Sequence, residues 1–419
     1  MSSAREDAQE ELQADEEARS ARARTGLTGL VRFRSGGLRI MRSRKSRIWL
    51  VLAIAGPGIV AANAGNDAAG IATYASAGSQ FVYRTLFFML LVTIALVLVQ
   101  EMAVRLGTYT GKGLAALIRE QFTLRQTAVA LGCVLLANTG LVVSEFAGIG
   151  AAFELLGVSR FIIIPIAAIL GHPDWAQVGQ NLVIPQFETS KAFLLLGVAL
   201  IGTTVSPYMQ LYAAAGVVDK GADPADYPRA RIDAISGALF ACIVSVTIII
   251  ATAAAIGGKG PLSSASEAAK ALEPVAGSGA EVLFAIGLIG ASALAGAVVP
   301  LSSAYAISEA VGVERSVSRR FTEARLFLGL FTVQVIIGAS LALTHINLIQ
   351  LLIGTQVLQG IVTPVILIYI LILTNRRSVL GKAANKPLFR VVASMCVIGI
   401  SAMSLLLLGS TILGFFGIG

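Results

Sequence analysis

The stretch IAGPGIVAANAGNDAAGIATY, residues 54–74, decides the fold of this chain. It is apolar enough to lie in a membrane, yet its centre carries Asp67 between Gly65 and Gly70. A charged carboxylate near the middle of a bilayer costs at least about 2.5–3.5 kcal/mol on insertion scales, so it marks a functional site. Glycine on both sides lets a helix unwind and frees backbone carbonyls to face a cavity. The stretch therefore predicts a broken membrane helix in which Asp67 binds a cation.

Composition places the chain among multi-pass membrane proteins. Of 419 residues, 56% are hydrophobic and 13% charged, and the mean hydropathy is +0.80, which excludes an ordinary soluble domain. Cys133, Cys242 and Cys396 stand singly, without the spacing of a zinc site or a disulfide framework. The basic residues behind the net charge of +8 fall in short loops without interleaved aromatic residues, so we expect no nucleic-acid partner.

Residues 1–48 are predicted to form a polar tail in front of a transmembrane transporter domain over residues 49–419. The first half of the tail is acidic and the second half basic, and charge blocks of this kind remain largely disordered. The basic half should lie near anionic lipid on the cytoplasmic side. We therefore expect a multi-pass protein of the cell membrane, with the lipid bilayer as a partner and a cytoplasmic N-terminus.

Apolar runs predict nine spans, over residues 49–82 (broken), 86–104, 127–157, 192–218 (broken), 235–256, 281–307, 326–343, 350–373 and 391–416. Lys and Arg concentrate in alternate loops, as expected for cytoplasmic loops. This alternation requires that FIIIPIAAIL, residues 161–170, crosses the membrane an even number of times. The segment has ten residues and contains Pro165, whereas one spanning helix needs about 20, so we expect it to dip in or lie at the interface.

A second interruption is predicted at GTTVSPY, residues 202–208. Pro207 removes a backbone donor and clashes with the carbonyl four residues earlier, so the helix should open between Gly202 and Ser206. Threonine and serine oxygens and freed carbonyls would supply hard ligands. Neighbouring helices often satisfy proline kinks in membrane proteins, but two interrupted spans, one in each half, are typical of inverted-repeat transporters with a midplane site.

Five motifs resemble the NRAMP divalent-metal transporters. They are GPGIVAANAGNDAAG (56–70) for the first helix with its Asp-Pro-Gly-Asn box, RLGTYTGKGLA (105–115), SEFAG (144–148), GTTVSPY for the sixth-helix pattern GATVMPH, and TQV (355–357) for the tenth helix. The resemblance covers nearly everything from residue 50 onward. It implies an all-α integral membrane protein, an inverted-repeat bundle of the APC or leucine-transporter type with broken first and sixth helices. It also implies transport by alternating access and no enzymatic activity.

Departures from the family pattern point to the cargo. Ala68, Ala69 and Gly70 replace the Pro, Gly and Asn of the box, and Ser206 replaces the methionine of the sixth helix. Thioethers favour transition metals, whereas carboxylates, carbonyls and hydroxyls suit Mg²⁺ and Mn²⁺, and Mg²⁺ usually keeps several waters. The pattern is similar to that of NRAMP-related magnesium transporters. It predicts a partly hydrated Mg²⁺, and also Mn²⁺, as transported substrate, with no cofactor.

The resemblance also implies residue roles. Asp67 would be the charged ligand, Thr203 would offer its carbonyl and Ser206 its hydroxyl, directly or through water. The other candidates are Gln356 and Gln359, which would hold water beside the ion, Asn66, which has no family counterpart, and Glu145, a proton or structural site. For either glutamine, simple hydrogen bonding between helices is an equally good interpretation.

Proton coupling is predicted to be absent. The family associates it with histidines on the sixth helix, where this chain has Tyr208 and Ala213, and both histidines of the chain, His172 and His345, fall in predicted outside loops. The gradient of a divalent ion at 100 mV supplies about 4.6 kcal/mol by itself. The alternatives are a proton-coupled Mn²⁺ or Fe²⁺ importer and a sodium-coupled solute symporter, in which Asp67 would repel a carboxylate substrate.

The family has two further spans between its third and sixth helices. Residues 158–171 are too few for them, so helices four and five are expected to be missing or truncated. We expect the protein to be a monomer.

Overall fold

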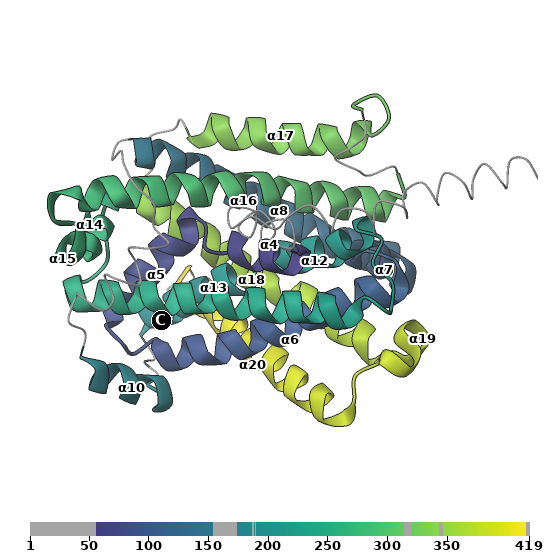
Figure 1. Ribbon diagram of the computed structural model, residues 1–419, viewed down its shortest axis with the longest axis horizontal. Coiled ribbons are helices and arrows are strands. Elements are labelled where there is room, and N and C mark those ends of the chain that lie inside the picture. Colours follow the sequence, from purple (N-terminus) through teal and green to yellow (C-terminus); the bar gives the residue numbers. More distant parts are fainter. Residues whose placement is uncertain are drawn as a thin grey trace, which may run out of the picture. The chain divides into compact units, whose positions relative to one another are not determined.

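The computed structural model describes residues 56–153, 174–186, 188, 190–313, 320–342 and 347–415. Every regular element in these ranges is helical (Figure 1). The polar tail, the FIIIPIAAIL segment, His172 and His345 lie outside the described residues. What the sequence predicts for them therefore stays a prediction.

Long helices make up most of the described part. They are α6 (Leu86–Thr110), α8 (Leu124–Phe153), α13 (Tyr227–Ile256), α16 (Ala280–Val311), α17 (Arg325–Ala342), α18 (Leu348–Asn375) and α20 (Pro387–Phe415). Together with the interrupted span over residues 191–219, they give eight candidate membrane spans in the described ranges. The 25 residues of α6 extend over about 38 Å, enough to cross a hydrocarbon core of about 30 Å. The chain is a multi-pass membrane protein.

Two pairs of shorter helices replace two continuous spans. The first pair is α4 (Pro57–Ala64) and α5 (Ala68–Phe81), and the second is α11 (Lys191–Thr204) and α12 (Pro207–Asp219). In the second pair only Val205 and Ser206 lie between the helices, so Gly202, Thr203 and Thr204 are helical and the opening is narrower than the sequence predicts. Pro207 is the first residue of α12. At that position a backbone N–H would have no partner within the helix, so proline costs no hydrogen bond there.

Short helices occupy the connections. They are α7 (Leu114–Gln121), α10 (Trp175–Val183), α14 (Ala265–Ala269), α15 (Glu273–Ala276), α19 (Arg377–Leu380) and three 3₁₀ turns over residues 270–272, 277–279 and 381–383. Side chains fix several helix starts: Asp174 caps α10, and the Ser190 hydroxyl accepts the Phe193 N–H at the start of α11. Gly111 ends α6 in the left-handed conformation, with a φ of 63°, which glycine adopts without strain.

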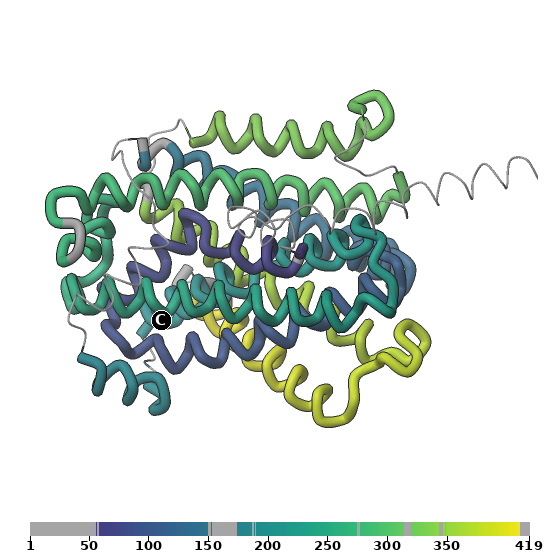
Figure 2. Tube along the Cα trace, in the orientation of Figure 1, coloured from purple at the N-terminus to yellow at the C-terminus, as the bar shows by residue number. Residues whose placement is uncertain are grey.

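The interrupted helices lie inside the bundle. The first pair packs against α13, and α11 packs against α18, while α8, α16 and α17 lie side by side along one flank (Figures 1 and 2). Small residues permit these close approaches: a Cβ at Gly202 would overlap the Gln356 carbonyl, and a Cβ at Gly360 would overlap the Val198 carbonyl. Backbone of α11 and α18 thus meets directly beside the second interruption.

Candidate metal site

Asp67 begins α5. Its carboxylate accepts the Gly70 N–H as a helix cap, and Oδ1 also accepts the Gln356 Nε2–H at 3.2 Å. The side chain is 1% exposed. Because the amino end of a helix carries partial positive charge, α5 stabilises this carboxylate in its charged form. Asp67 is therefore both a structural cap and a buried negative charge that can attract a cation.

Three oxygen atoms surround Gly70. A Cβ at this position would lie 2.5 Å from the Gly65 carbonyl oxygen, 2.6 Å from Thr203 Oγ1 and 3.1 Å from Asp67 Oδ1. The Thr203 hydroxyl donates to the Gly65 carbonyl at 3.0 Å and so links the two interruptions. No side chain fits at position 70 without a shift. The structure brings Asp67 and Thr203 close together, and it is the Thr203 hydroxyl rather than its carbonyl that makes the contact with the first interruption.

Two helix carboxyl ends meet the amino ends of α5 and α12 in this region. The carboxyl ends of α4 and α11 both terminate here, at Ala64 and Thr204. The last carbonyls of a helix carry partial negative charge, and half-helices of this kind coordinate cations in membrane transporters. No three side chains of His, Cys, Asp or Glu gather at one point in the described ranges. A cation at Asp67 would therefore rely on carbonyl, hydroxyl, amide and water oxygens.

Gln356 and Gln359 lie in different surroundings, although both are fully buried on α18. Gln356 contacts Asp67, as described above. Gln359 instead donates to Asn138 Oδ1 at 3.2 Å, and the Asn138 amide donates to Ser303 Oγ at 2.9 Å. These bonds connect α18 to α8 and α16. Gln359 therefore makes hydrogen bonds between helices.

Asn66 forms hydrogen bonds with α13, and Ser206 forms one within its own span. The Asn66 amide donates to the Ala241 carbonyl at 3.1 Å and accepts the Ser245 hydroxyl at 2.9 Å, so it anchors the first interruption to α13. The Ser206 hydroxyl donates to the Gly202 carbonyl of its own span. A direct contact between Ser206 and an ion would require that bond to open.

Glu145 lies next to the site. It is fully buried on α8, and its Oε2 accepts the Ala68 N–H at 3.4 Å. Two carboxylates, Asp67 and Glu145, thus share the amino end of α5. The positive end of that helix lies beside both side chains.

Two sulfur atoms near the interruptions were missed from the sequence. A Cβ at Gly65 would overlap the methyl carbon of Met209, so the thioether lies against the first interruption. Cys242 lines a void with no room for water, together with Gly65 and Asn66. No spacing in the sequence signals Met209 here, because its position depends on how α12 packs beside α4.

Comparisons with known proteins agree with this architecture. The family model described as "Natural resistance-associated macrophage protein-like" (Nramp) matches residues 58–171 and 166–410. The divalent metal cation transporter MntH of Verminephrobacter eiseniae is 26% identical and aligns with 89% of this chain and 92% of its own. The MntH of Burkholderia ambifaria is also 26% identical, over 86% of this chain and 90% of its own.

A solved structure shares the fold. The manganese transporter of Eremococcus coleocola superposes with a TM-score of 0.68 at 19% identity, over 91% of each chain. The same helical arrangement is therefore known from a transporter crystal structure. Because the family model matches nearly all of residues 58–410, the chain belongs to the Nramp family.

Proposed function

We propose that this chain transports a divalent metal cation across the membrane by alternating access, with Asp67 as the charged ligand. The observation that carries the proposal is the convergence of the Asp67 carboxylate, the Gly65 carbonyl and the Thr203 hydroxyl around Gly70, where α4 and α11 end. The named relatives are transporters of divalent metal cations. The metal is cargo rather than a cofactor, and the chain is not an enzyme.

Mn²⁺ is the first candidate cargo. The relatives are called divalent metal cation transporters, and the superposed structure is a manganese transporter. These names favour the alternative of a Mn²⁺ importer over the magnesium interpretation. The chemistry agrees, because Mn²⁺ accepts carboxylate, carbonyl and water ligands. Met209 also adds a thioether beside Gly65.

Mg²⁺ is a second candidate, supported by Ser206 at the position of the family's methionine. A partly hydrated ion is supported by Gln356, whose Oε1 is buried without a hydrogen-bond partner in the described part of the chain. A buried amide oxygen of this kind accepts well from an ordered water. Water held by Gln356 would lie next to Asp67, to which the Nε2 of the same amide donates.

Proton coupling belongs to the Mn²⁺ importer alternative, and the shared position of Glu145 and Asp67 supplies a pair of carboxylates that could carry a proton. Uncoupled transport is supported by Tyr208 in place of the family's histidine. Reconstituted vesicles with an internal pH indicator distinguish the two. Acidification that depends on Mn²⁺ entry supports coupling, and metal entry without acidification supports uncoupled transport.

We also propose that the first of the two inverted repeats is shorter in this chain than in the family. The alignment with the Verminephrobacter relative spans 428 positions, more than the 419 residues of this chain, so the relative has residues that this chain lacks. The two matches to the family model also meet at residues 166–171, inside the region where helices four and five are expected to be missing. Intact-mass measurement of the expressed protein tests whether the shortened chain is the protein as made.

Metal titration tests the cargo directly. Purified protein is titrated calorimetrically with Mn²⁺, Mg²⁺ and Cd²⁺. We expect Mn²⁺ to bind, and millimolar Mg²⁺ to displace it only if Mg²⁺ is also a cargo. Cd²⁺ should bind with little more affinity than Mn²⁺, because the oxygen donors outnumber the single thioether at the site. No binding of Mn²⁺ or Mg²⁺ by the folded protein would contradict the proposal.

A further inference from the structure

The Tyr208 hydroxyl is buried without a protein partner. Tyr208 is the second residue of α12 and is 0% exposed. Its hydroxyl oxygen has no hydrogen-bond partner among the described residues. A buried polar group without a hydrogen-bond partner lowers the stability of the folded protein. A phenylalanine would fill the same space without that loss of stability. An unpaired hydroxyl in a closely packed interior therefore requires an explanation.

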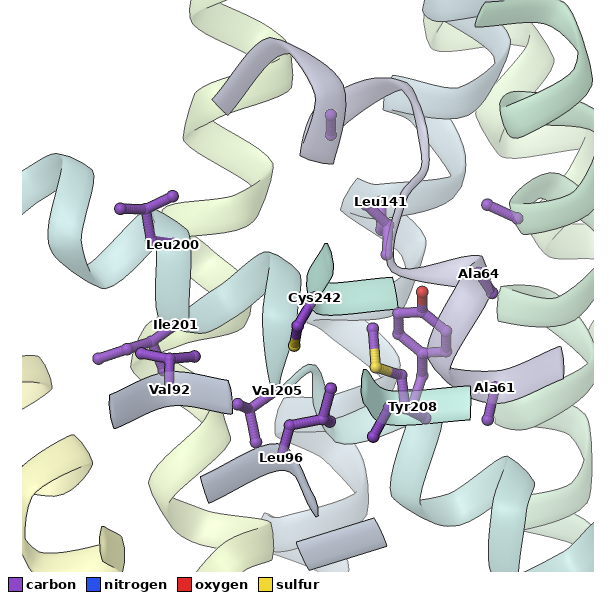
Figure 3. Packing of buried hydrophobic residues seen from close by; sticks show 14 of the residues in the cluster. Ala61, Ala64, Val92, Leu96, Leu141, Leu200, Ile201, Val205, Tyr208 and Cys242 are labelled. Carbon is purple, nitrogen blue, oxygen red and sulfur yellow. The ribbon is translucent and has the colours of Figure 1, made fainter. Parts of the chain in front are cut away.

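The surroundings of the phenol connect it to the metal site. Tyr208 interacts electrostatically with Asp67 and Glu145. Figure 3 shows its oxygen between Ala64, the last residue of α4, and Leu141, one turn before Glu145 on α8. The Ser302 hydroxyl donates to the Tyr208 carbonyl at 3.0 Å and fixes the backbone from α16. The phenol thus lies beside the end of α4, within electrostatic range of the two carboxylates.

A second buried tyrosine, Tyr74 on α5, has a hydrogen-bond partner. The Tyr74 hydroxyl pairs with Thr204 Oγ1 at 3.0 Å. Both rings are almost completely buried, at 1% and 0% exposure. Among the described residues, the Tyr208 hydroxyl has no partner whereas the Tyr74 hydroxyl has one, so the two residues form a matched pair for a test.

We propose that the Tyr208 hydroxyl is a further oxygen of the metal site, which acts on the ion through one of the ion's water molecules. The inference rests on the proposed transport function. A phenol donates one hydrogen bond and accepts others. It can therefore accept from a metal-bound water and donate toward Asp67 or Glu145. A bridging water is nearly as favourable as a direct hydrogen bond, and it would supply the partner that the protein does not.

This role makes Tyr208 a specificity-determining residue for hydrated ions. Mg²⁺ gives up its waters more reluctantly than larger ions do. Loss of the hydroxyl should therefore weaken Mg²⁺ binding more than Mn²⁺ binding. A purely structural role would change both affinities alike or neither.

The test compares Tyr208→Phe with Tyr74→Phe in the full-length protein. Thermal unfolding is measured without metal, and Mn²⁺ and Mg²⁺ affinities are measured by titration calorimetry. We expect Tyr208→Phe to unfold at the same or a higher temperature than the wild type, and to bind Mn²⁺ about five- to tenfold more weakly. Tyr74→Phe should show the reverse: lower stability and a Mn²⁺ affinity within about twofold of the wild type.

The outcomes separate this inference from the proposed function. If the wild type binds neither Mn²⁺ nor Mg²⁺, the transport proposal fails and this inference fails with it. If the wild type binds Mn²⁺ and Tyr208→Phe binds it equally well, only the role of Tyr208 is overturned. A Tyr208→Phe protein that is less stable without metal also overturns it, because the hydroxyl would then have a protein partner.

Discussion

At the scale of single residues, two departures from the family pattern compensate each other. The position of the family's box asparagine is Gly70, and the position of the alanine in its sixth-helix pattern is Thr203. In the structure the Thr203 hydroxyl lies 2.6 Å from where a Cβ at position 70 would be. The hydroxyl thus occupies space that a side chain at position 70 would need. In this chain, an oxygen atom from α11 therefore lies where a side chain at position 70 would be.

We therefore predict that Gly70 and Thr203 are energetically coupled. Gly70→Ala should destabilise the protein by about 1–3 kcal/mol, because the added methyl group overpacks the site. In the double variant with Thr203→Ala, the loss should be smaller, since the hydroxyl is gone and the Gly65 carbonyl is released from its hydrogen bond. Thermal unfolding of both single variants and the double variant measures the coupling. Strictly additive losses would show that the two positions do not compete for space.

Some of the site was predictable from residue types and some was not. Asp67 could be found because a carboxylate inside a long apolar stretch has few structural reasons to be there. The positions of Met209 and the Tyr208 hydroxyl depend on how α12 packs beside α4, and neither local sequence nor spacing determines that packing. Asn66 could not be assigned for the same reason: its amide faces α13, as the contacts with Ala241 and Ser245 show.

At the scale of elements, α4 is held to α13 by one carboxylate. Asp233 accepts the Gly56 N–H and the Gly58 N–H, each at 2.9 Å. These groups belong to the amino end of α4, whose capping residue Gly56 has no side chain to satisfy them. A Cβ at Gly237 would lie 2.6 Å from the Ile59 Cα, so the two helices touch at the backbone. Asp233 therefore acts as a cap supplied by another helix.

Removal of this cap should loosen α4. We predict that Asp233→Ala lowers stability by about 1–3 kcal/mol, because two buried donors lose their acceptor. Amide hydrogen exchange should speed up in α4 more than in α5, which has its own cap at Asp67. Glu120→Ala is a suitable control, since Glu120 forms an ion pair with Lys112 in which both side chains are nearly half exposed, and such pairs contribute little. Equal exchange in α4 before and after the substitution would show that other contacts hold this helix.

Helix positions were largely predictable from the sequence. The long apolar runs coincide with α6, α8, α13, α16, α17, α18 and α20 to within a few residues at most ends. The exceptions are informative. The opening expected between Gly202 and Ser206 is confined to Val205 and Ser206, because a proline at the first position of a new helix needs only a short break before it. The short helices α7 and α10 lack a spanning apolar run and were not predicted.

At the scale of the whole molecule, sequence composition was sufficient to identify a multi-pass helical membrane protein. The choice between Mg²⁺ and Mn²⁺ could not be made in this way, since both ions accept the same oxygen ligands. We propose, for either ion, that the negative charge of Asp67, at the junction of α4 and α5, captures the cation.

Asp67→Asn isolates that charge. Asparagine caps helices about as well as aspartate, so the start of α5 should be preserved while the charged ligand is lost. The direct measurement is Mn²⁺ uptake into proteoliposomes by the wild type and by this variant, with thermal unfolding of both as the control. We predict uptake by the wild type, and its loss in a variant of nearly unchanged stability. Uptake by Asp67→Asn at the wild-type rate would contradict the assignment of Asp67 as the ligand.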